Sequence, residues 1–550
     1  MINRLSRYLR KSAFSIHWPL LLFLLMIMDV KMAVKVVVLV IFLVRDYKIF
    51  TAKNIFRRSH TWFYAIMAGM VVLHMIISFS SFTPNYLVAA GLGLFYWLCC
   101  ILAAMILQRE TSRADTKTLH NTISLFLLLN ILFTALQLLM IMIDAGSVNP
   151  FTYQGMQQKY FIGTGDLLTG ITMDVSTTNA VICSMGIIYC LHRKQWVLTL
   201  LCMACLLVTA SNITFLLLLL VFVFMFIFRS TKLQKSIITI CLFGGLVFMT
   251  KVSPQNNTYV KEAWGKMLGI KKTKVVAPED LLTIKAKPDS TLNGEEIKQK
   301  KAMLALDSVS TVEKKETVPA RITPVPTTKK ELVVSTGHKP VLPKDNIHTQ
   351  PFQRRHDTSG YQRALLSFAV TTRAGVDTSL KKTKSRRIPG KIIALEETIT
   401  YLNAHPLQWL IGAGCGNFSS KLAFRTTALG ISGGYPERFK YIHPAFLKNH
   451  LALYLNYFSK DIEIHSVINN PNSVYNQLLS EYGLAGMAAF LVFYAGYFFR
   501  QTRKNSYALP LLLFLMGTLA VEYWFEQLSI VILFECMMLI HQKEKEAGHE

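Results

Sequence analysis

The feature that most constrains this chain is a series of long apolar runs separated by short basic loops. A bilayer core of about 30 Å needs roughly 20 apolar residues in a helix, and about twelve segments approach that length. Hydrophobic residues make up 52% of the 550 and charged residues only 17%, against about 25% in soluble domains. This excludes a soluble enzyme, a disordered chain and a fibrous protein. The candidate spans are residues 14–29, 31–44, 61–80, 86–107, 119–143, 174–191, 196–210, 212–228, 235–250, 484–499, 506–523 and 525–541.

These spans predict an all-α polytopic membrane protein, in which the first two short segments can also form one re-entrant hairpin. Lys and Arg gather in every second loop, at residues 45–58, 109–117, 193–194, 229–235 and 500–504. Because basic loops stay in the cytoplasm, we expect both termini to be cytoplasmic. The same alternation places the long segment between the ninth and tenth spans on the outer side.

The outer segment divides into two parts of different composition. Residues 251–355 are rich in Lys, Thr and Pro, which predicts a weakly ordered stretch. Residues 356–482 include Lys391–Leu402, where apolar residues recur at helical spacing, so this part is expected to be an ordered, largely helical loop that carries the site. The remaining predicted domains are the first nine spans (1–250) and the last three spans with a cytoplasmic tail (483–550).

The formal net charge of +27 is spread over short loops and the outer segment rather than over one compact domain. This distribution argues against a nucleic-acid partner, whereas a basic outer surface suits a substrate that bears phosphate. Cys415 is alone among the nine cysteines in falling outside the apolar runs and their edges, so no intramolecular disulfide is expected in the outer part. The sequence shows no metal-ligand cluster and no dinucleotide or phosphate-loop motif, and we expect no cofactor.

Two stretches of the outer loop carry a family resemblance. The first is His405-Pro406 followed by Gly412-Ala413-Gly414-Cys415-Gly416-Asn417-Phe418, and the second runs from His465 through Asn472, Tyr475 and Glu481 to Gly486. With the run from Asp174 to Ala180 and the spacing of the spans, the chain resembles the O-antigen ligase and O-antigen polymerase family over about residues 120–500. It departs from the family at Asn472, where the ligases have a His, and at Ser211-Asn212, where an Arg often follows the Ser.

The resemblance implies a glycosyltransferase of the bacterial inner membrane, with the large loop in the periplasm. Its substrate would be a glycan on undecaprenyl pyrophosphate, and its acceptor another glycan or the lipid A-core; the resemblance does not decide between ligase and polymerase. Two alternatives remain open. One is a transporter or flippase of lipid-linked glycans, and the other is a non-catalytic envelope scaffold that binds partners through residues 270–355.

The implied transfer needs cations to stabilise the leaving pyrophosphate and a base for the acceptor hydroxyl. Without a metal, side chains must supply both. The candidate catalytic residues are Arg438, Arg387, His465 and Glu481. The candidate substrate-binding residues are Arg425, Lys391, His443, His450, Asn472, Asn476 and Tyr435. Carboxylates at span ends, such as Asp174 and Glu526, are further candidates because charges near the membrane core are costly.

Overall fold

A computed structural model describes the parts of the chain considered below. These are residues 15–47, 59–77, 83–145, 148–152, 165, 167–253, 389–427, 434–451, 453–454, 470–503 and 506–547. The chain divides into two compact units, and every described residue belongs to the unit formed by Met1–Val260, Thr336–Lys382 and Ile388–Glu550. The predicted low-order character of residues 251–355 falls, beyond residue 253, outside the described residues.

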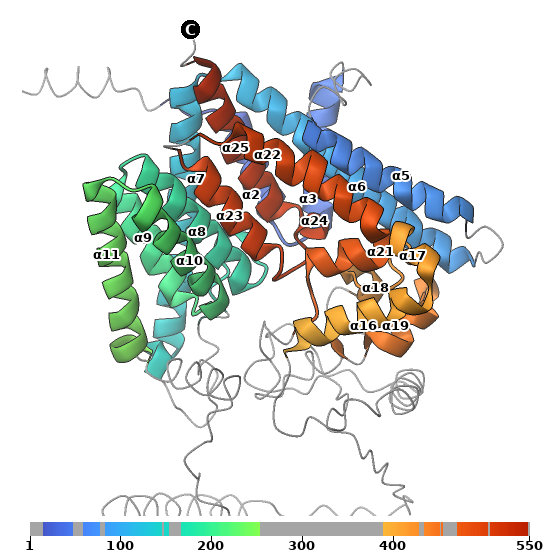
Figure 1. Cartoon of the computed structure of the whole chain (residues 1–550). Helices are drawn as coiled ribbons and strands as arrows, with labels where there is room; N and C mark the ends of the chain where they lie inside the picture. The colour runs from blue at the N-terminus through green and yellow to red at the C-terminus, as the bar shows by residue number, and fades with distance from the viewer. Residues whose placement is uncertain are drawn as a thin grey trace, which may run out of the picture. The chain divides into compact units, whose positions relative to one another are not determined.

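Every regular element in the described ranges is a helix, which confirms the predicted all-α class for this part of the chain (Figure 1). Each of the predicted spans falls on a helix. These helices are α2 (Trp18–Met28), α3 (Met32–Arg45), α5 (Ser59–Ile77), α6 (Pro84–Arg113), α7 (Thr116–Ala145), α8 (Ser176–His192), α9 (Trp196–Val208), α10 (Asn212–Phe228), α11 (Lys232–Val247), α21 (Val474–Ala489), α23 (Ala508–Thr518) and α25 (Ser529–Ala547).

Five helical stretches of the described residues are long and apolar enough to cross a membrane: His60–Ile77, Pro84–Arg113, Thr116–Ile143, Lys232–Val252 and Val474–Gln501. Helices α2, α9, α10 and α23 are apolar but shorter. The described part is therefore a helical membrane protein, while the number of spans stays a prediction.

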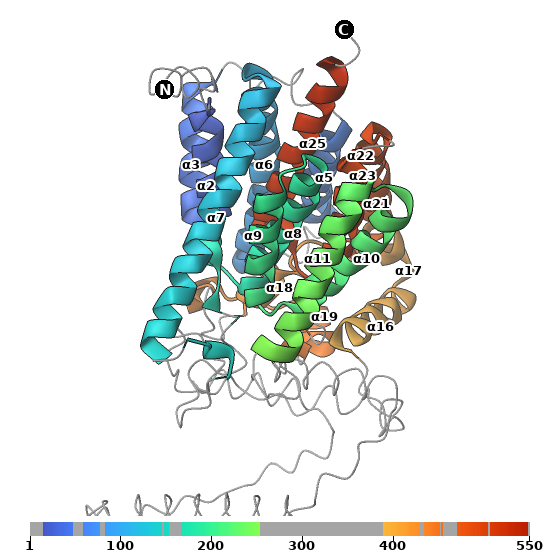
Figure 2. The same cartoon turned by 90° about the vertical axis from the view of Figure 1, so that its left-hand side faces the viewer.

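Helices α25 and α8 form the core of the bundle (Figure 2). All side chains of α25 from Ser529 to His541 are buried, and α8 is buried over almost its whole length. A helix that is apolar on every side is stable only when other helices surround it. Beside α25, the ring of Phe63 lies 5.7 Å from Trp97, 5.5 Å from Tyr494 and 5.2 Å from Phe525, measured between centroids.

The tenth predicted span, 484–499, is longer in the structure. Its helix, α21, begins at Val474 and has a kink at Gly483, whose φ of 64° and ψ of −162° are not helical. It then continues through a π-helical turn, Phe490–Ala495, into α22 (Gly496–Gln501). Polar side chains of the closing motif, such as Asn476 and Glu481, therefore lie inside the helix. Both are buried. The polar contacts described below replace their hydrogen bonds to water and so offset the cost of burying these side chains in a helix.

The last predicted span, 525–541, is interrupted in the structure. A short helix, α24 (Trp524–Gln527), ends at Leu528, whose φ of 66° is left-handed, and α25 starts at the next residue. A left-handed conformation is costly for a residue with a side chain. The break exposes the carbonyl of Gln527, which accepts a hydrogen bond from the ammonium of Lys35 on α3, and this bond offsets part of the cost.

Four α-helices are described within the segment that separates α11 from α21. They are α16 (Gly390–Ala404), α17 (Pro406–Ile411), α18 (Lys421–Arg425) and α19 (Pro444–Asn449). Helix α16 confirms the helix predicted over Lys391–Leu402. Helices α16 and α17 pack on α21, and α18 packs on α6. This segment thus brings Lys421 and Arg425 of α18 next to α6.

Candidate functional site

The Gly-rich element, residues 412–416, is a tight turn that lies against α21. Gly412, Gly414 and Gly416 have φ values of +80°, +95° and +75°, a region that side chains disfavour. A Cβ on Gly412 would lie 2.3 Å from the carbonyl carbon of Glu481, so the two backbones touch. The N–H of Gly414 donates to the carbonyl of Glu481 at 3.0 Å. Gly412 thus allows close packing of this turn against the backbone of α21.

The Glu481 side chain anchors this turn from inside the helix. It is fully buried, and its two carboxylate oxygens accept the N–H groups of Gly416 at 3.0 Å and Phe418 at 3.1 Å. It does not line the pocket described below. The predicted catalytic residue Glu481 therefore occupies a position where it holds the backbone that leads into α18.

Helix α18 carries two basic residues, Lys421 and Arg425, one helical turn apart. Ser420 caps the helix by accepting the N–H of Ala423 at 3.0 Å, and the N–H of Leu422 donates to Glu526 Oε2 at 3.1 Å. Because residues four apart share one helix face, both cations point the same way. Lys421 and Arg425 are half-buried and line one pocket.

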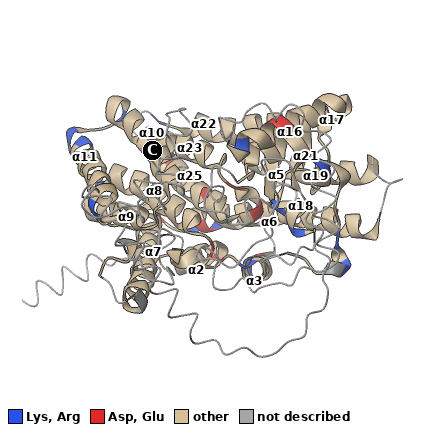
Figure 3. Cartoon of the chain, turned by 90° about the horizontal axis from the view of Figure 1, so that it is seen from below, with Lys and Arg blue, Asp and Glu red and all other residues tan. Residues whose placement is uncertain are grey.

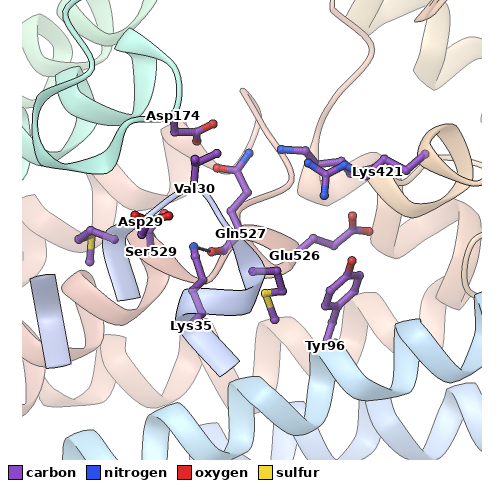
Figure 4. A pocket seen from close by; sticks show the side chains of 12 residues that line it. Asp29, Val30, Lys35, Tyr96, Asp174, Lys421, Glu526, Gln527 and Ser529 are labelled. Carbon is purple, nitrogen blue, oxygen red and sulfur yellow. Dashed lines mark hydrogen bonds between the residues drawn. The ribbon is translucent and has the colours of Figure 1, made fainter. Parts of the chain in front are cut away.

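The pocket collects side chains from five separate segments of the chain around a cavity of about 30 Å³ (Figure 4). The α2–α3 turn, α6, the start of α8, α18 and the α24–α25 break all contribute. The lining residues are Met28, Asp29, Val30, Met32, Lys35, Tyr96, Asp174, Lys421, Arg425, Glu526, Gln527 and Ser529. Three are cations and three are carboxylates, so the pocket presents both signs of charge.

Glu526 and Gln527 link the two sides of the pocket. Glu526 Oε1 accepts the amide of Gln477 at 2.6 Å, which together with the bond from Leu422 fixes the carboxylate. With its amide oriented to suit its neighbours, Gln527 donates to Asp174 Oδ2 at 3.2 Å and accepts from Lys421 Nζ at 3.1 Å. In the described ranges, no group of three or more His, Cys, Asp or Glu side chains is arranged to hold a metal ion.

Two tyrosines border the basic side of the pocket. The hydroxyls of Tyr96 and Tyr435 lie 2.7 Å apart, and the N–H of Tyr435 donates to the carbonyl of Arg425 at 2.9 Å. Burial raises the pKa of Tyr435, so its phenol stays neutral at physiological pH. Of the residues predicted from the sequence, Arg425, Asp174 and Glu526 line the pocket and Tyr435 is next to it.

Other predicted residues lie elsewhere. Arg438 is exposed and stacks on the ring of Phe439, 4.6 Å from its centroid. His443 caps α19 by accepting the N–H of Ala445 at 3.2 Å. Burial, with a smaller contribution from His405, lowers the pKa of His443 to about 4, so the ring is neutral at physiological pH. Arg387 and His465 lie outside the described residues.

Lys391 and Asn472 form a polar latch with Glu522. The Lys391 ammonium donates to the carbonyls of Asn472 at 2.5 Å and Val521 at 2.9 Å. The side-chain amide of Asn472 donates to Glu522 Oε1 at 2.7 Å. Burial lowers the pKa of Lys391 to about 7, and the nearby Glu522 opposes part of that shift. The latch joins the start of α16 to the start of α21 and to the turn after α23.

His450 and Asn476 belong to a second polar network, centred on Ser419. Ser419 Oγ lies 3.2 Å from His450 Nε2 and accepts the amide of Asn476 at 2.9 Å, and His450 Nδ1 lies 3.2 Å from Glu397 Oε2. The order of hydroxyl, imidazole and carboxylate is that of a nucleophile with its base. Ser419 is fully buried and also meets the Tyr523 hydroxyl at 3.0 Å, so the network supports the residues that precede α18.

Sequence reasoning missed Lys35, Lys421, Tyr96, Asp29 and Gln527 as parts of one site. For Lys35 a signal was available: it is a charged residue inside the apolar run Met32–Val44, and charges in such runs are functional candidates. Its side chain is only 3% exposed. For the other four residues, only the packing of distant segments reveals that they meet.

The pocket combines cations suited to a phosphate, carboxylates suited to hydroxyl groups or a proton, and an aromatic ring. Its position at the ends of membrane helices suits a substrate held partly in the bilayer. No protein-family model matches this chain, and no curated protein or solved structure is similar to it.

Proposed function

We propose that this chain is a membrane glycosyltransferase that transfers or polymerises an undecaprenyl-pyrophosphate-linked oligosaccharide at the outer face of the bacterial inner membrane. The observation that carries the proposal is the pocket where Lys421 and Arg425 face Glu526 at the ends of membrane helices. The family resemblance of the outer loop supports the substrate class. Ligase and polymerase activities place the same demands on the pocket.

The cations bind the leaving group in this proposal. Lys421 and Arg425 stabilise the negative charge that develops on the diphosphate, because charge-assisted hydrogen bonds to phosphate are strong. Lys35 lies on the floor of the same pocket, next to Gln527 (Figure 4). The apolar residues Met28, Val30 and Met32 of the α2–α3 turn line the pocket too, and they offer a surface for the first units of the polyprenyl chain.

Glu526 is the proposed general base. The acceptor hydroxyl attacks the anomeric carbon and passes its proton to the carboxylate, while the bond between that carbon and the diphosphate oxygen breaks and the lipid diphosphate leaves with the electron pair. The bonds from Leu422 and Gln477 orient Glu526 without using all of its lone pairs. Asp29 and Asp174, which line the same pocket, bind sugar hydroxyls.

The test is an envelope glycan profile, resolved by chain length, of a strain that lacks the protein and is complemented with variants. We expect Arg425→Ala and Glu526→Gln to abolish transfer while the protein still inserts, and Lys232→Ala, an exposed residue on the first turn of α11, to restore the profile. Chains stranded on the carrier lipid indicate a ligase, and chains stopped at one repeat indicate a polymerase.

Two outcomes contradict the proposal. An unchanged glycan profile in the deletion strain shows that the protein does not have the proposed activity. Full transfer by Arg425→Ala together with loss in Arg438→Ala moves the site away from the pocket and toward the exposed residue that the sequence suggested.

A further inference from the structure

Helices α16 and α17 present an apolar surface that no described residue covers. Ile392, Leu395 and Ile399 are 52%, 42% and 39% exposed, and Leu407 and Leu410 are 68% and 58% exposed. The first three recur at positions i, i+3 and i+7, so they share one face of α16. The other face of α16 packs into the protein through Ile393, Ala394, Thr398 and Leu402. Contiguous exposed apolar surface of this kind marks contact with a membrane or with a protein.

Helix α17 lies directly against a membrane helix. A Cβ on Gly483 of α21 would lie 2.6 Å from the carbonyl carbon of Leu410, so the two backbones touch at this level. The next residue, Leu484, is 49% exposed, and farther along the same helix Leu491 and Val492 are 51% and 56% exposed. The apolar surface of α17 therefore continues into the exposed side of the spanning stretch Val474–Gln501.

The length of this stretch fixes the level of α17. Arg500, exposed near its far end, marks one boundary of the hydrocarbon core. Gly483 lies seventeen residues before Arg500. At 1.5 Å per residue these cover about 26 Å, close to the roughly 30 Å thickness of that core. Leu410 thus lies at the opposite boundary of the core, where apolar side chains still reach acyl chains.

We propose that α16 and α17 lie in the membrane interface, with Ile392, Leu395, Ile399, Leu407 and Leu410 in contact with the lipid acyl chains. Figure 3 shows both helices at the periphery of the helical bundle, where lipid has access. Helices of this type bury one apolar face at the boundary between headgroups and acyl chains. Because the Gly-rich turn joins α17 to α18, the interface contact holds Lys421 and Arg425 at the level of the lipid phosphates. The inference does not depend on the proposed reaction.

Spin labelling of the full chain in phosphatidylcholine and phosphatidylglycerol nanodiscs tests this inference. All nine native cysteines are buried, so they compete little with an introduced surface cysteine, and the unmodified protein measures the background. Labels are placed at Leu407→Cys and Leu410→Cys, at Leu491→Cys as a lipid-facing reference, and at Thr400→Cys as a reference on the polar, exposed side of α16. Power saturation then compares collisions with oxygen, which concentrates in lipid, and with a water-soluble nickel chelate.

We expect labels at Leu407 and Leu410 to collide more with oxygen than with nickel, as at Leu491, and the label at Thr400 to show the reverse. Nickel accessibility at Leu407 and Leu410 equal to that at Thr400 overturns the inference, because the surface then faces water. Low accessibility to both reagents also overturns it, since another segment of this chain or a second copy then covers the face. Only variants whose elution volume in size-exclusion chromatography matches that of the unmodified protein are compared.

Discussion

At the scale of single residues, Lys391 makes the free energy of unfolding depend on pH. Its pKa in the folded protein is about 7, below the value of about 10.4 in an unfolded chain. Between these values the unfolded chain binds more protons, so the free energy of unfolding rises with pH. Below pH 7 the ammonium is charged in both states, and its burial penalty is fully present.

We therefore predict that Lys391 stabilises the protein more at pH 9 than at pH 6.5. The measurement is the thermal midpoint of purified wild type and Lys391→Met at several pH values in one detergent. The thermal midpoint of the wild type minus that of Lys391→Met should increase as pH rises. The reason is that the neutral amine carries no burial penalty for a charge and still donates to Asn472 and Val521. A difference that stays constant over this window shows that Lys391 does not titrate as described.

A second prediction at this scale separates an anchor from a base. Glu481→Gln keeps the size of the side chain but leaves one acceptor oxygen for the two N–H groups of Gly416 and Phe418. An unmade hydrogen bond to a buried group costs about 1–3 kcal/mol, so we expect a lower thermal midpoint with transfer retained per folded molecule. Loss of transfer at an unchanged midpoint would give Glu481 the catalytic role that the sequence suggested.

Residue roles were the hardest part to predict from the sequence. Arg425 is predicted to bind substrate because it is a cation within the resembling loop, and in the structure it lines the pocket. Asn472 and His450 are predicted to bind substrate from their positions in or near the closing motif, and in the structure they belong to the polar latch and to the Ser419 network. Spacing along the chain does not reveal whether a polar side chain faces a cavity or a neighbouring backbone.

At the scale of elements, the contact between α17 and α21 depends on glycine. Gly483 has a φ of +64°, and its missing side chain admits the backbone of Leu410. We predict that Gly483→Ala lowers the free energy of unfolding by at least about 1–2 kcal/mol, the cost of a left-handed alanine alone. Chemical denaturation monitored by circular dichroism measures the change.

Gly91→Ala in α6 is the matched control, because a Cβ there meets nothing within 4 Å and alanine favours a helix interior. It should leave stability unchanged or raise it slightly. Equal losses in the two variants would show that the close approach of α17 to α21 contributes nothing.

The elements themselves were largely predictable, since apolar runs of about 20 residues and the helical spacing in Lys391–Leu402 depend on local sequence. The interruption at Leu528 was not. Apolar residues continue across it, and the contact that offsets part of its cost, between the Gln527 carbonyl and Lys35, involves a residue near the other end of the chain. Local sequence patterns do not predict contacts between residues so far apart in the chain.

At the scale of the whole molecule, the chain separates into two units, the smaller formed by Lys261–Ser335 and Thr383–Arg387. We predict that deleting residues 261–335 leaves the thermal midpoint of the purified protein unchanged, because the helical unit has its own core. The glycan profile of the same variant tests the scaffold alternative. Loss of assembly with Lys421 and Arg425 dispensable would favour a scaffold over an enzyme.

The pocket draws on the α2–α3 turn near the start of the chain and on the α24–α25 break near its end. Ribosomes deliver these segments to the membrane in order, so Lys35 and Asp29 enter the bilayer long before Glu526 has been synthesised. The site therefore cannot exist on a nascent chain or on a truncated product. Insertion of the last helix is the step that completes the pocket, because Ser529 at the start of α25 is among the lining residues.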